Sequence, residues 1–133
     1  MNQNELDKVR SWPLHHSWGV QSIHALDGRS EISVQVNESM SNPAGTMHGG
    51  LIYALTDVAA YTALLSVVEE NQTGVTHHIN VQVLRPVQLG AVLRIEAEVI
   101  KRGRRLSFIE SKAYMEDKVV ALASITKSMV TLS

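Results

Sequence analysis

Residues 51–68 read LIYALTDVAAYTALLSVV, and Asp57 is the only charged residue in this stretch of eighteen. This length is close to the minimum for a membrane span. A carboxylate at mid-span is costly, however, at about 2.5–3.5 kcal/mol on insertion scales, and no basic cluster flanks the segment. A helix that is apolar on nearly every side is otherwise buried in a protein core. We therefore expect a core helix from about Gly49 to Glu69 and no membrane partner.

The composition limits the remaining possibilities. The chain has 133 residues, a formal net charge of −1 and no cysteine. This length fits one domain, and the near-zero charge argues against a nucleic-acid partner, which would require an excess of Lys and Arg. The absence of cysteine excludes a disulfide scaffold, a thiolate nucleophile and a cysteine-ligated metal. The polar N-terminus lacks the apolar run of a signal peptide, so we expect a cytoplasmic protein.

Alternating apolar and polar residues predict two strands before the helix and four after it. The first two form a hairpin around the turn dipeptide Asp27-Gly28. In the third strand, the odd-numbered residues from Val75 to Val83 are expected on one face and Thr76, with the other even-numbered residues, on the opposite face. Residues 1–16 form an N-terminal extension that the pattern leaves without a role. The last four strands are predicted within residues 75–83, 93–99, 106–115 and 119–130.

A helix of about 20 residues spans roughly 30 Å, the width of a small domain. A helix that is apolar on most sides cannot lie on the surface of a flat sheet. We therefore predict an α+β fold in which a six-stranded antiparallel sheet wraps around one long central helix. The remaining apolar face of the helix is expected to be covered by a second copy of the chain.

The helix begins at His48-Gly49-Gly50, where glycines cost stability, about 1 kcal/mol each relative to alanine. One interpretation is a tight turn that needs positive φ. The other is that the bare backbone N–H groups, at the positive end of the helix dipole, bind negative charge such as the oxyanion of an attacked carbonyl.

Asp57 is predicted to border the apolar stripe of the helix. A partly buried carboxylate suits a general base or a nucleophile, although it could also satisfy a neighbouring hydroxyl or face solvent. His48 and Asp57 are nine residues apart, or about 13 Å along a helix, so one chain cannot bring both to the same atom. Two antiparallel helices across a two-fold axis would form composite sites in a homodimer. The stripe is expected to consist of Leu51, Leu55, Val58, Thr62 and Leu65.

Residues 42–57, NPAGTMHGGLIYALTD, resemble the signature of the hotdog-fold acyl-CoA thioesterases, in the branch that contains the phenylacetate-degradation enzymes. The similarity extends from about Trp18 to Thr131 and includes GVTHHINVQVLRP and the turn KRGRR. It implies one hotdog domain over residues 1–133, a homodimer that commonly pairs into a dimer of dimers, and hydrolysis of an acyl-CoA to a free acid and CoA. Coenzyme A is then part of the substrate, and no metal or redox cofactor is implied.

The resemblance also implies residue roles. Asp57 corresponds to the catalytic carboxylate, as base or nucleophile, and Gly49 to the residue whose N–H polarises the thioester carbonyl. His48 and Asn42 would order the loop, and Thr76 would lie near the Asp of the partner chain. The residues expected to line the substrate site are Met47, Gly50, Tyr61 and His77.

Lys101-Arg102-Gly103-Arg104-Arg105 places four cations at a strand turn. This is either solvated surface or a contact of Arg102, Arg104 and Arg105 with the phosphates of coenzyme A, since Arg binds phosphate through paired hydrogen bonds. His77 and His78 are predicted on opposite faces of a strand, which argues against a metal site. Two other functions stay open at this level: an acyl-CoA-binding module without catalysis, and a hotdog-type hydratase or dehydratase.

Overall fold

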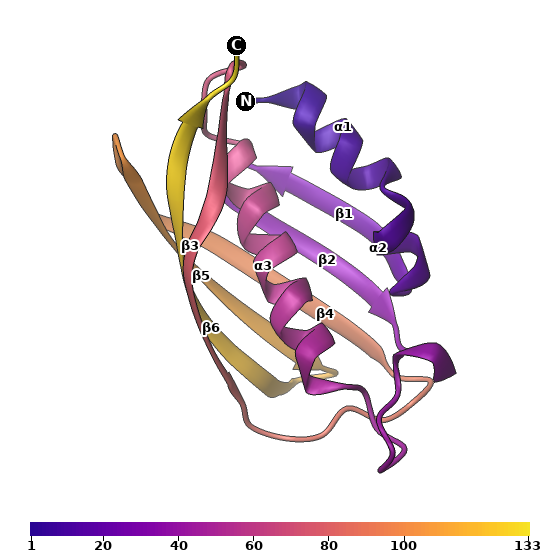
Figure 1. The fold of residues 1–133 in the computed structure, drawn as a ribbon. Helices are drawn as coiled ribbons and strands as arrows, with labels where there is room; N and C mark the ends of the chain where they lie inside the picture. Colours follow the sequence, from indigo (N-terminus) through magenta and orange to yellow (C-terminus); the bar gives the residue numbers. More distant parts are fainter.

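Six strands form one antiparallel sheet whose concave face holds the long helix α3, as a computed structural model of residues 1–133 shows (Figure 1). The strand order is β1-β2-β4-β5-β6-β3, so β1 and β3 are the edge strands. The predicted class and element order are confirmed. The elements are α1 (Gln3–Ser11), α2 (Pro13–Ser17), β1 (Val20–Leu26), β2 (Arg29–Gln35), a short 3-10 turn (Glu38–Met40), α3 (Gly49–Leu65), β3 (Gln72–Val83), β4 (Val92–Arg102), β5 (Leu106–Met115) and β6 (Lys118–Thr131).

The β1–β2 turn ties the hairpin to the end of α3. Asp27 and Gly28 both have positive φ, 51° and 79°, as a type I′ turn requires. The Gly28 N–H donates to Ser66 Oγ at 2.8 Å, and the Ser66 hydroxyl donates to the Ala63 carbonyl at 2.7 Å. Ser66 is therefore bonded to both elements at the point where the helix ends.

The predicted C-terminal boundary of the helix is wrong, because α3 ends at Leu65 rather than near Glu69. The Ser66 N–H bonds to Ala63, three residues back, which tightens the last turn. Val68 beyond it is still buried, at 1% exposure. The apolar run therefore continues past the helix into the connecting loop, and hydrophobicity alone cannot mark the boundary.

Hydrogen bonds from the sheet fix the rotation of α3. Ser30 Oγ on β2 donates to the Ala59 carbonyl at 2.6 Å, and Ser111 Oγ on β5 donates to the Thr56 carbonyl at 2.9 Å. The buried face therefore differs from the predicted stripe, since Leu51 and Val58 are only half-buried. The fully buried residues are Ile52, Leu55, Thr56, Ala59, Ala60, Thr62, Ala63, Leu64 and Leu65.

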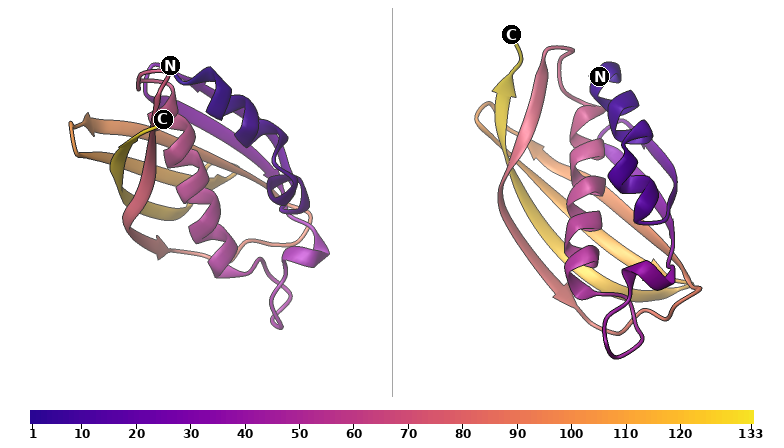
Figure 2. Two further views of the ribbon diagram at one scale, coloured as in Figure 1. Left: turned by 45° about the horizontal axis from the view of Figure 1, so that its top comes forward. Right: turned by 45° about the vertical axis from the view of Figure 1, so that its right-hand side comes forward.

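The N-terminal helix α1 packs against α3 on the same side of the sheet (Figure 2). Leu6 and Val9 are 1% and 6% exposed and belong to the core. Asn2 anchors the start of the chain, because its N–H donates to the Leu65 carbonyl at 2.9 Å and its side chain to the Gln72 carbonyl at 2.7 Å. The extension therefore has a structural role that the sequence did not reveal. It covers part of the helix face that we expected a second copy to cover.

None of the helices combines the length and the apolar character needed to cross a bilayer. Two polar residues of the apolar stretch, Thr56 and Thr62, are accommodated inside the core. Thr56 and Thr62 donate to the carbonyls of Tyr53 and Ala59, each three residues back, at 2.8 and 3.0 Å.

Replacing Leu6 with alanine should destabilise the protein by about 2–5 kcal/mol, because it leaves a cavity between α1 and α3. Leu14→Ala is the matched control, since Leu14 on α2 is 47% exposed and its truncation should change stability by about 0.5 kcal/mol or less. Urea unfolding at equal protein concentration measures both. Equal losses in the two variants would show that α1 is not part of the core.

Candidate functional site

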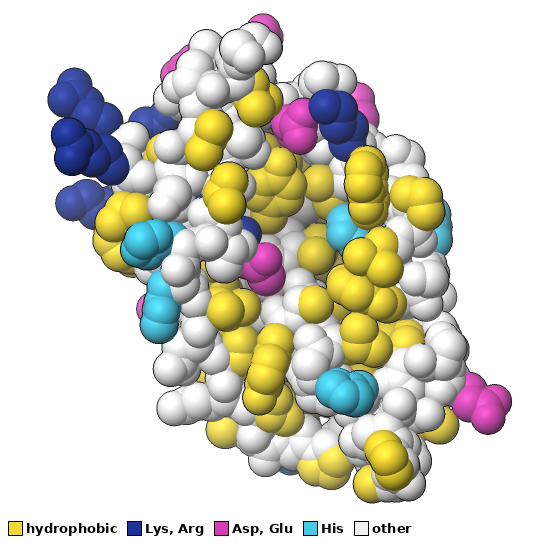
Figure 3. All heavy atoms as spheres, viewed as in Figure 1, with side chains coloured by type: hydrophobic (Ala, Val, Ile, Leu, Met, Phe, Trp, Pro, Cys, Tyr) yellow, Lys and Arg dark blue, Asp and Glu magenta, His cyan; other side chains and the backbone are white.

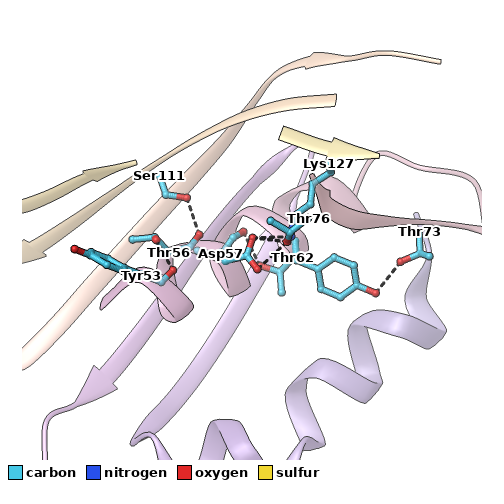
Figure 4. Close-up of polar contacts among 10 residues, drawn as sticks. Tyr53, Thr56, Asp57, Thr62, Thr73, Thr76, Ser111 and Lys127 are labelled. Atoms are coloured by element: carbon cyan, nitrogen blue, oxygen red, sulfur yellow. Dashed lines mark hydrogen bonds and ion pairs between the residues drawn. The ribbon is translucent and has the colours of Figure 1, made fainter. Parts of the chain in front are cut away.

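Asp57 projects from the middle of α3 toward β3 and β6, where two side chains hold its carboxylate (Figure 4). Thr76 Oγ1 lies 2.9 Å from both Oδ1 and Oδ2. Lys127 Nζ lies 2.7 Å from Oδ1 and 2.6 Å from Thr76 Oγ1. The Asp57 side chain is 31% exposed, so the carboxylate is held from behind and remains accessible from one side.

A β-bulge explains why Thr76 reaches Asp57. The pairing of β3 with β6 runs Thr76↔Lys127 and then His78↔Thr126, so His77 is an extra residue in β3. An extra residue reverses which side chains face inward. Thr76 faces the helix before the bulge, whereas Val81 packs against the core after it. The prediction that Thr76 and Val81 lie on opposite faces of the strand is wrong for this reason.

Thr76 also corrects a second expectation. It was expected to lie near the Asp of a partner chain, but its hydroxyl bonds to Asp57 of its own chain. Aspartate and hydroxyl therefore form one unit within a protomer. This unit exists without a second copy of the chain.

Lys127 is the site residue that the sequence analysis missed. Its side chain is only 3% exposed, and its ammonium lies 5.4 Å from the centre of the Tyr61 ring. Burial lowers the pKa of Lys127, and the Asp57 carboxylate acts in the opposite direction. The available signal was the period of two along β6, which puts Lys127 on the same buried face as Ala121, Ala123 and Ile125.

Gly74 provides the room for the buried lysine stem. A Cβ at position 74 would lie 2.6 Å from Leu64 Cδ2 and 3.1 Å from Lys127 Cβ. A larger residue here would require Leu64 and the stem of Lys127 to shift at this crossing of α3, β3 and β6. The missing side chain lets the strand approach closely enough for Lys127 and Thr76 to reach the helix.

A pocket of about 510 Å³ opens beside Asp57, between α1 and α3, and we call it the Asp57 pocket. Figure 3 shows this face hollowed near its centre, with hydrophobic side chains around the hollow. The Tyr61 hydroxyl bonds to Thr73 Oγ1 at 2.7 Å and lies 3.4 Å from Glu5 Oε2, and burial raises the pKa of Tyr61. Residues that line the pocket include Val9 and Trp12 from the N-terminal segment, Val58 and Tyr61 from α3, and Thr76 and Lys127 from the sheet.

The start of α3 forms a separate group that does not line the Asp57 pocket. His48 is the N-cap, and its Nδ1 accepts the Gly50 N–H at 2.9 Å. The Gly49 N–H makes no hydrogen bond, and nothing lies within 4 Å of where a Cβ on Gly49 would be. Within one chain, this free donor and Asp57 are therefore kept apart, and this separation agrees with the prediction from the helical spacing.

Asn42 orders the loop before the helix, in agreement with its predicted role. Its Oδ1 accepts the N–H groups of Ala44 and Thr46 at 3.0 and 3.1 Å. Met47 was expected to line the substrate site, but it is 3% exposed and belongs to the hydrophobic core. That expectation is wrong for the single chain.

The remaining predicted contacts lie away from the Asp57 pocket. His77 is exposed at the bulge, 3.4 Å from Ser128 Oγ. Arg102 donates to Gln72 Oε1, whereas the side chains of Arg104 and Arg105 are exposed and unpaired. Figure 3 shows Lys and Arg side chains gathered at its left edge, where the β4–β5 turn lies in Figure 1.

A second hollow of about 440 Å³ contains none of the predicted site residues. Its lining is mostly charged and includes four glutamates, among them Glu96 and Glu98 of β4. The Asp57 pocket is therefore the one that combines a depression with the carboxylate, the buried lysine and apolar walls.

Comparison with known proteins agrees with this architecture. Residues 44–122 match the family model described as the thioesterase superfamily. Acyl-coenzyme A thioesterase 13 of Homo sapiens is 35% identical over 86 residues, which cover 65% of this chain and 61% of that protein. The chain thus matches about three-fifths of the length of this curated relative.

Solved structures confirm the hotdog fold. A phenylacetic acid degradation-related protein from Ralstonia eutropha superposes with a TM-score of 0.83 at 26% identity, covering 94% of this chain and 98% of that one. A hypothetical thioesterase with coenzyme A from Streptococcus pneumoniae superposes with a TM-score of 0.77 at 25% identity, covering 84% and 86%. The chain therefore belongs to the thioesterase superfamily, in its phenylacetate-degradation-like branch.

Proposed function

We propose that the protein hydrolyses an acyl-CoA thioester to the free carboxylic acid and coenzyme A. The observation that carries this proposal is the carboxylate of Asp57, which Thr76 and Lys127 hold at the edge of a partly apolar pocket. The names of the related proteins supply the substrate class.

The chemistry needs little beyond a carboxylate and an oxyanion donor. Asp57 either takes a proton from a water molecule that attacks the thioester carbonyl, or attacks the carbonyl itself to form an anhydride that water then hydrolyses. In both routes the carbon–sulfur bond breaks, and the coenzyme A thiolate leaves and is protonated. Because a thiolate is a good leaving group, the reaction does not require a Ser-His-Asp relay.

The oxyanion donor in this proposal is the Gly49 N–H of a second protomer. Gly49 has a free N–H at the positive end of α3, but it lies in a different group of residues from Asp57 of its own chain. Antiparallel pairing of two α3 helices would bring the partner's Gly49 to Asp57 and produce two equivalent sites. His48 and Asn42 would support the donor by fixing the start of the helix.

The exposed edge strand β3 supports a homodimer. Val75, Ile79 and Val83 on β3 are 57%, 37% and 40% exposed, and an unpaired apolar edge favours strand addition by another copy. Pairing of two such dimers would give the tetramer that the family resemblance implies.

The acyl group is expected to occupy the Asp57 pocket, whose apolar walls include Val9, Trp12 and Val58. Tyr61 lines the same pocket. The phosphates of coenzyme A are assigned to Arg104 and Arg105, whose guanidinium groups are free.

Asp57→Asn should lower kcat/KM by about 10²–10⁴-fold, because the amide can neither accept a proton nor attack the carbonyl. Thiol release from a panel of acyl-CoA thioesters measures the effect. Asp117→Asn, in the exposed β5–β6 turn, is the control and should retain full activity. A folded Asp57→Asn protein with undiminished hydrolysis would contradict the proposed function.

Gly49→Pro should lower kcat by about 10²–10³-fold, because proline removes the N–H but fits the first position of a helix. His48 already has the extended backbone, φ −61° and ψ 126°, that a residue before proline prefers. Gly49→Ala is the matched control, since it retains the N–H and its Cβ meets open space. Similar losses in both variants would exclude the N–H as the oxyanion donor.

Mixing Asp57→Asn with Gly49→Pro protomers tests the composite site. Random assortment makes half of the dimers heterodimers of the two variants. Each heterodimer has one intact site, formed by the unchanged Asp57 of one protomer and the unchanged Gly49 of the other, so activity should recover to about a quarter of wild type. Native mass spectrometry verifies that subunits have exchanged, because the two variants differ in mass. Exchange without recovery would show that both groups act within one chain.

The double variant Arg104→Ala with Arg105→Ala should raise KM for acyl-CoA substrates and leave kcat unchanged, because phosphate contacts bind the ground and transition states equally. The same acyl group on N-acetylcysteamine, which lacks the nucleotide, should show no change. A rise in KM for both substrates would assign the arginines to another role.

A further inference from the structure

Lys127 is the one lysine of the chain that is buried. Its ammonium makes its only ion pair with Asp57, and its second hydrogen bond is to Thr76. It comes from β6, so three separate elements meet at the carboxylate. This convergence suggests a role beyond packing.

The fold itself does not need a charge at this position. The preceding inward residues of β6, Ala121, Ala123 and Ile125, are all apolar and buried. Removing an ammonium from water is costly, and replacing a buried ion pair by apolar side chains is often neutral or stabilising. Stability therefore gives no reason for a lysine here, whereas its contact with Asp57 does.

The contacts of Lys127 determine how Thr76 donates. A lysine ammonium has three donors and no acceptor, so the contact between Nζ and Thr76 Oγ1 must use a lysine proton. The single hydroxyl proton of Thr76 is then left for Asp57. Lys127 thus orients the hydroxyl as well as pairing with the carboxylate.

The same contacts distinguish the two carboxylate oxygens. Oδ1 accepts from both Lys127 and Thr76, whereas Oδ2 is contacted only by Thr76. Because Thr76 has one proton to share between them, Oδ2 has the more available lone pairs. It is also the oxygen with no cation bound to it.

We propose that Lys127 is a positioning residue for thioester hydrolysis. Its ammonium occupies Oδ1 of Asp57 and orients the Thr76 hydroxyl, so that Oδ2 is the carboxylate oxygen that reacts. This inference rests on the proposed function. It adds a residue and an atom to the site, and it applies whether Asp57 acts as base or as nucleophile.

The inference predicts an alkaline limit to activity. Because burial lowers the pKa of Lys127, its charge should be lost at a lower pH than that of an exposed lysine, and the hold on Asp57 weakens with it. The other ionisable groups around it are Asp57 and Tyr61 of α3 and, across the pocket, Glu5, Lys8 and His15. Burial raises the pKa of Tyr61, so its phenol should titrate later than an ordinary tyrosine.

The kinetic test compares Lys127→Met, Lys127→Arg and wild type. Lys127→Met keeps the apolar stem and should lower kcat by about 100-fold with KM little changed, because a misplaced reacting group loses rate without losing binding. Lys127→Arg should recover part of kcat and shift the alkaline limit upward, since Arg stays charged. Lys118→Met is the matched control on an exposed position of the same strand and should behave as wild type.

A folded Lys127→Met protein with wild-type kcat would overturn the role of Lys127 alone. A wild-type protein that hydrolyses no acyl-CoA would overturn the proposed function and this inference with it. The two failures are therefore distinct. Circular dichroism of each variant establishes that it is folded. If Lys127→Met does not fold, Lys127→Arg still decides the test, because an unchanged kcat and an unchanged alkaline limit in Lys127→Arg would also overturn the role of Lys127.

The interaction between Lys127 and Asp57 can be measured without following hydrolysis. Carbon-13 NMR of labelled lysines should show one side chain, absent in Lys127→Arg, that titrates below 10.5, the ordinary value for lysine. In Asp57→Asn its titration midpoint should fall further, because the carboxylate that favours the charged form is gone. An unchanged midpoint would show that the two groups are not coupled and would overturn the inference.

Discussion

A helix that carries one charge in seventeen residues must be covered on nearly every side, and this constraint determines the architecture. The curled sheet covers most of α3, and α1 covers a further part through Leu6 and Val9. The uncovered remainder is the strip that contains Tyr53 and Asp57, beside the exposed edge of β3. The same requirement that buries the helix thus leaves its one carboxylate at the boundary between the core and a pocket.

The buried ion pair between Asp57 and Lys127 costs desolvation free energy, and core packing gives no reason for a charged pair at this position. A buried ammonium is weak support for stability, since its desolvation offsets much of its attraction to the carboxylate. Two local departures from regular structure allow the pair to form: the bulge at His77, which turns Thr76 inward, and the missing side chain of Gly74. Bulges that redirect a side chain are found near active sites, and this one serves the same carboxylate as the lysine.

The sequence predicted the elements well because hydrophobic period and turn chemistry are local. The type I′ turn at Asp27-Gly28 and the six strands needed only neighbouring residues. The sequence-based prediction failed where tertiary contacts determine which way a side chain faces and where a helix ends. Nothing local marks a bulge after Thr76, so the alternation of the strand placed that residue on the wrong face. Lys127 differs, because the period of two along β6 does place it on the buried face, but nothing local shows that it pairs with Asp57. The helix end was missed because burial continues through Val68.

The central claim is that Asp57 of one protomer and the partner's Gly49 act on one thioester. It is tested most directly by a crystal structure of the protein with a non-hydrolysable ketone analogue of an acyl-CoA. We expect the acyl group in the Asp57 pocket, the carbonyl carbon facing Oδ2, and the carbonyl oxygen about 2.7–3.1 Å from the partner's Gly49 nitrogen. An analogue bound outside that pocket, or with its carbonyl oxygen facing no backbone N–H of a second protomer, would contradict the account.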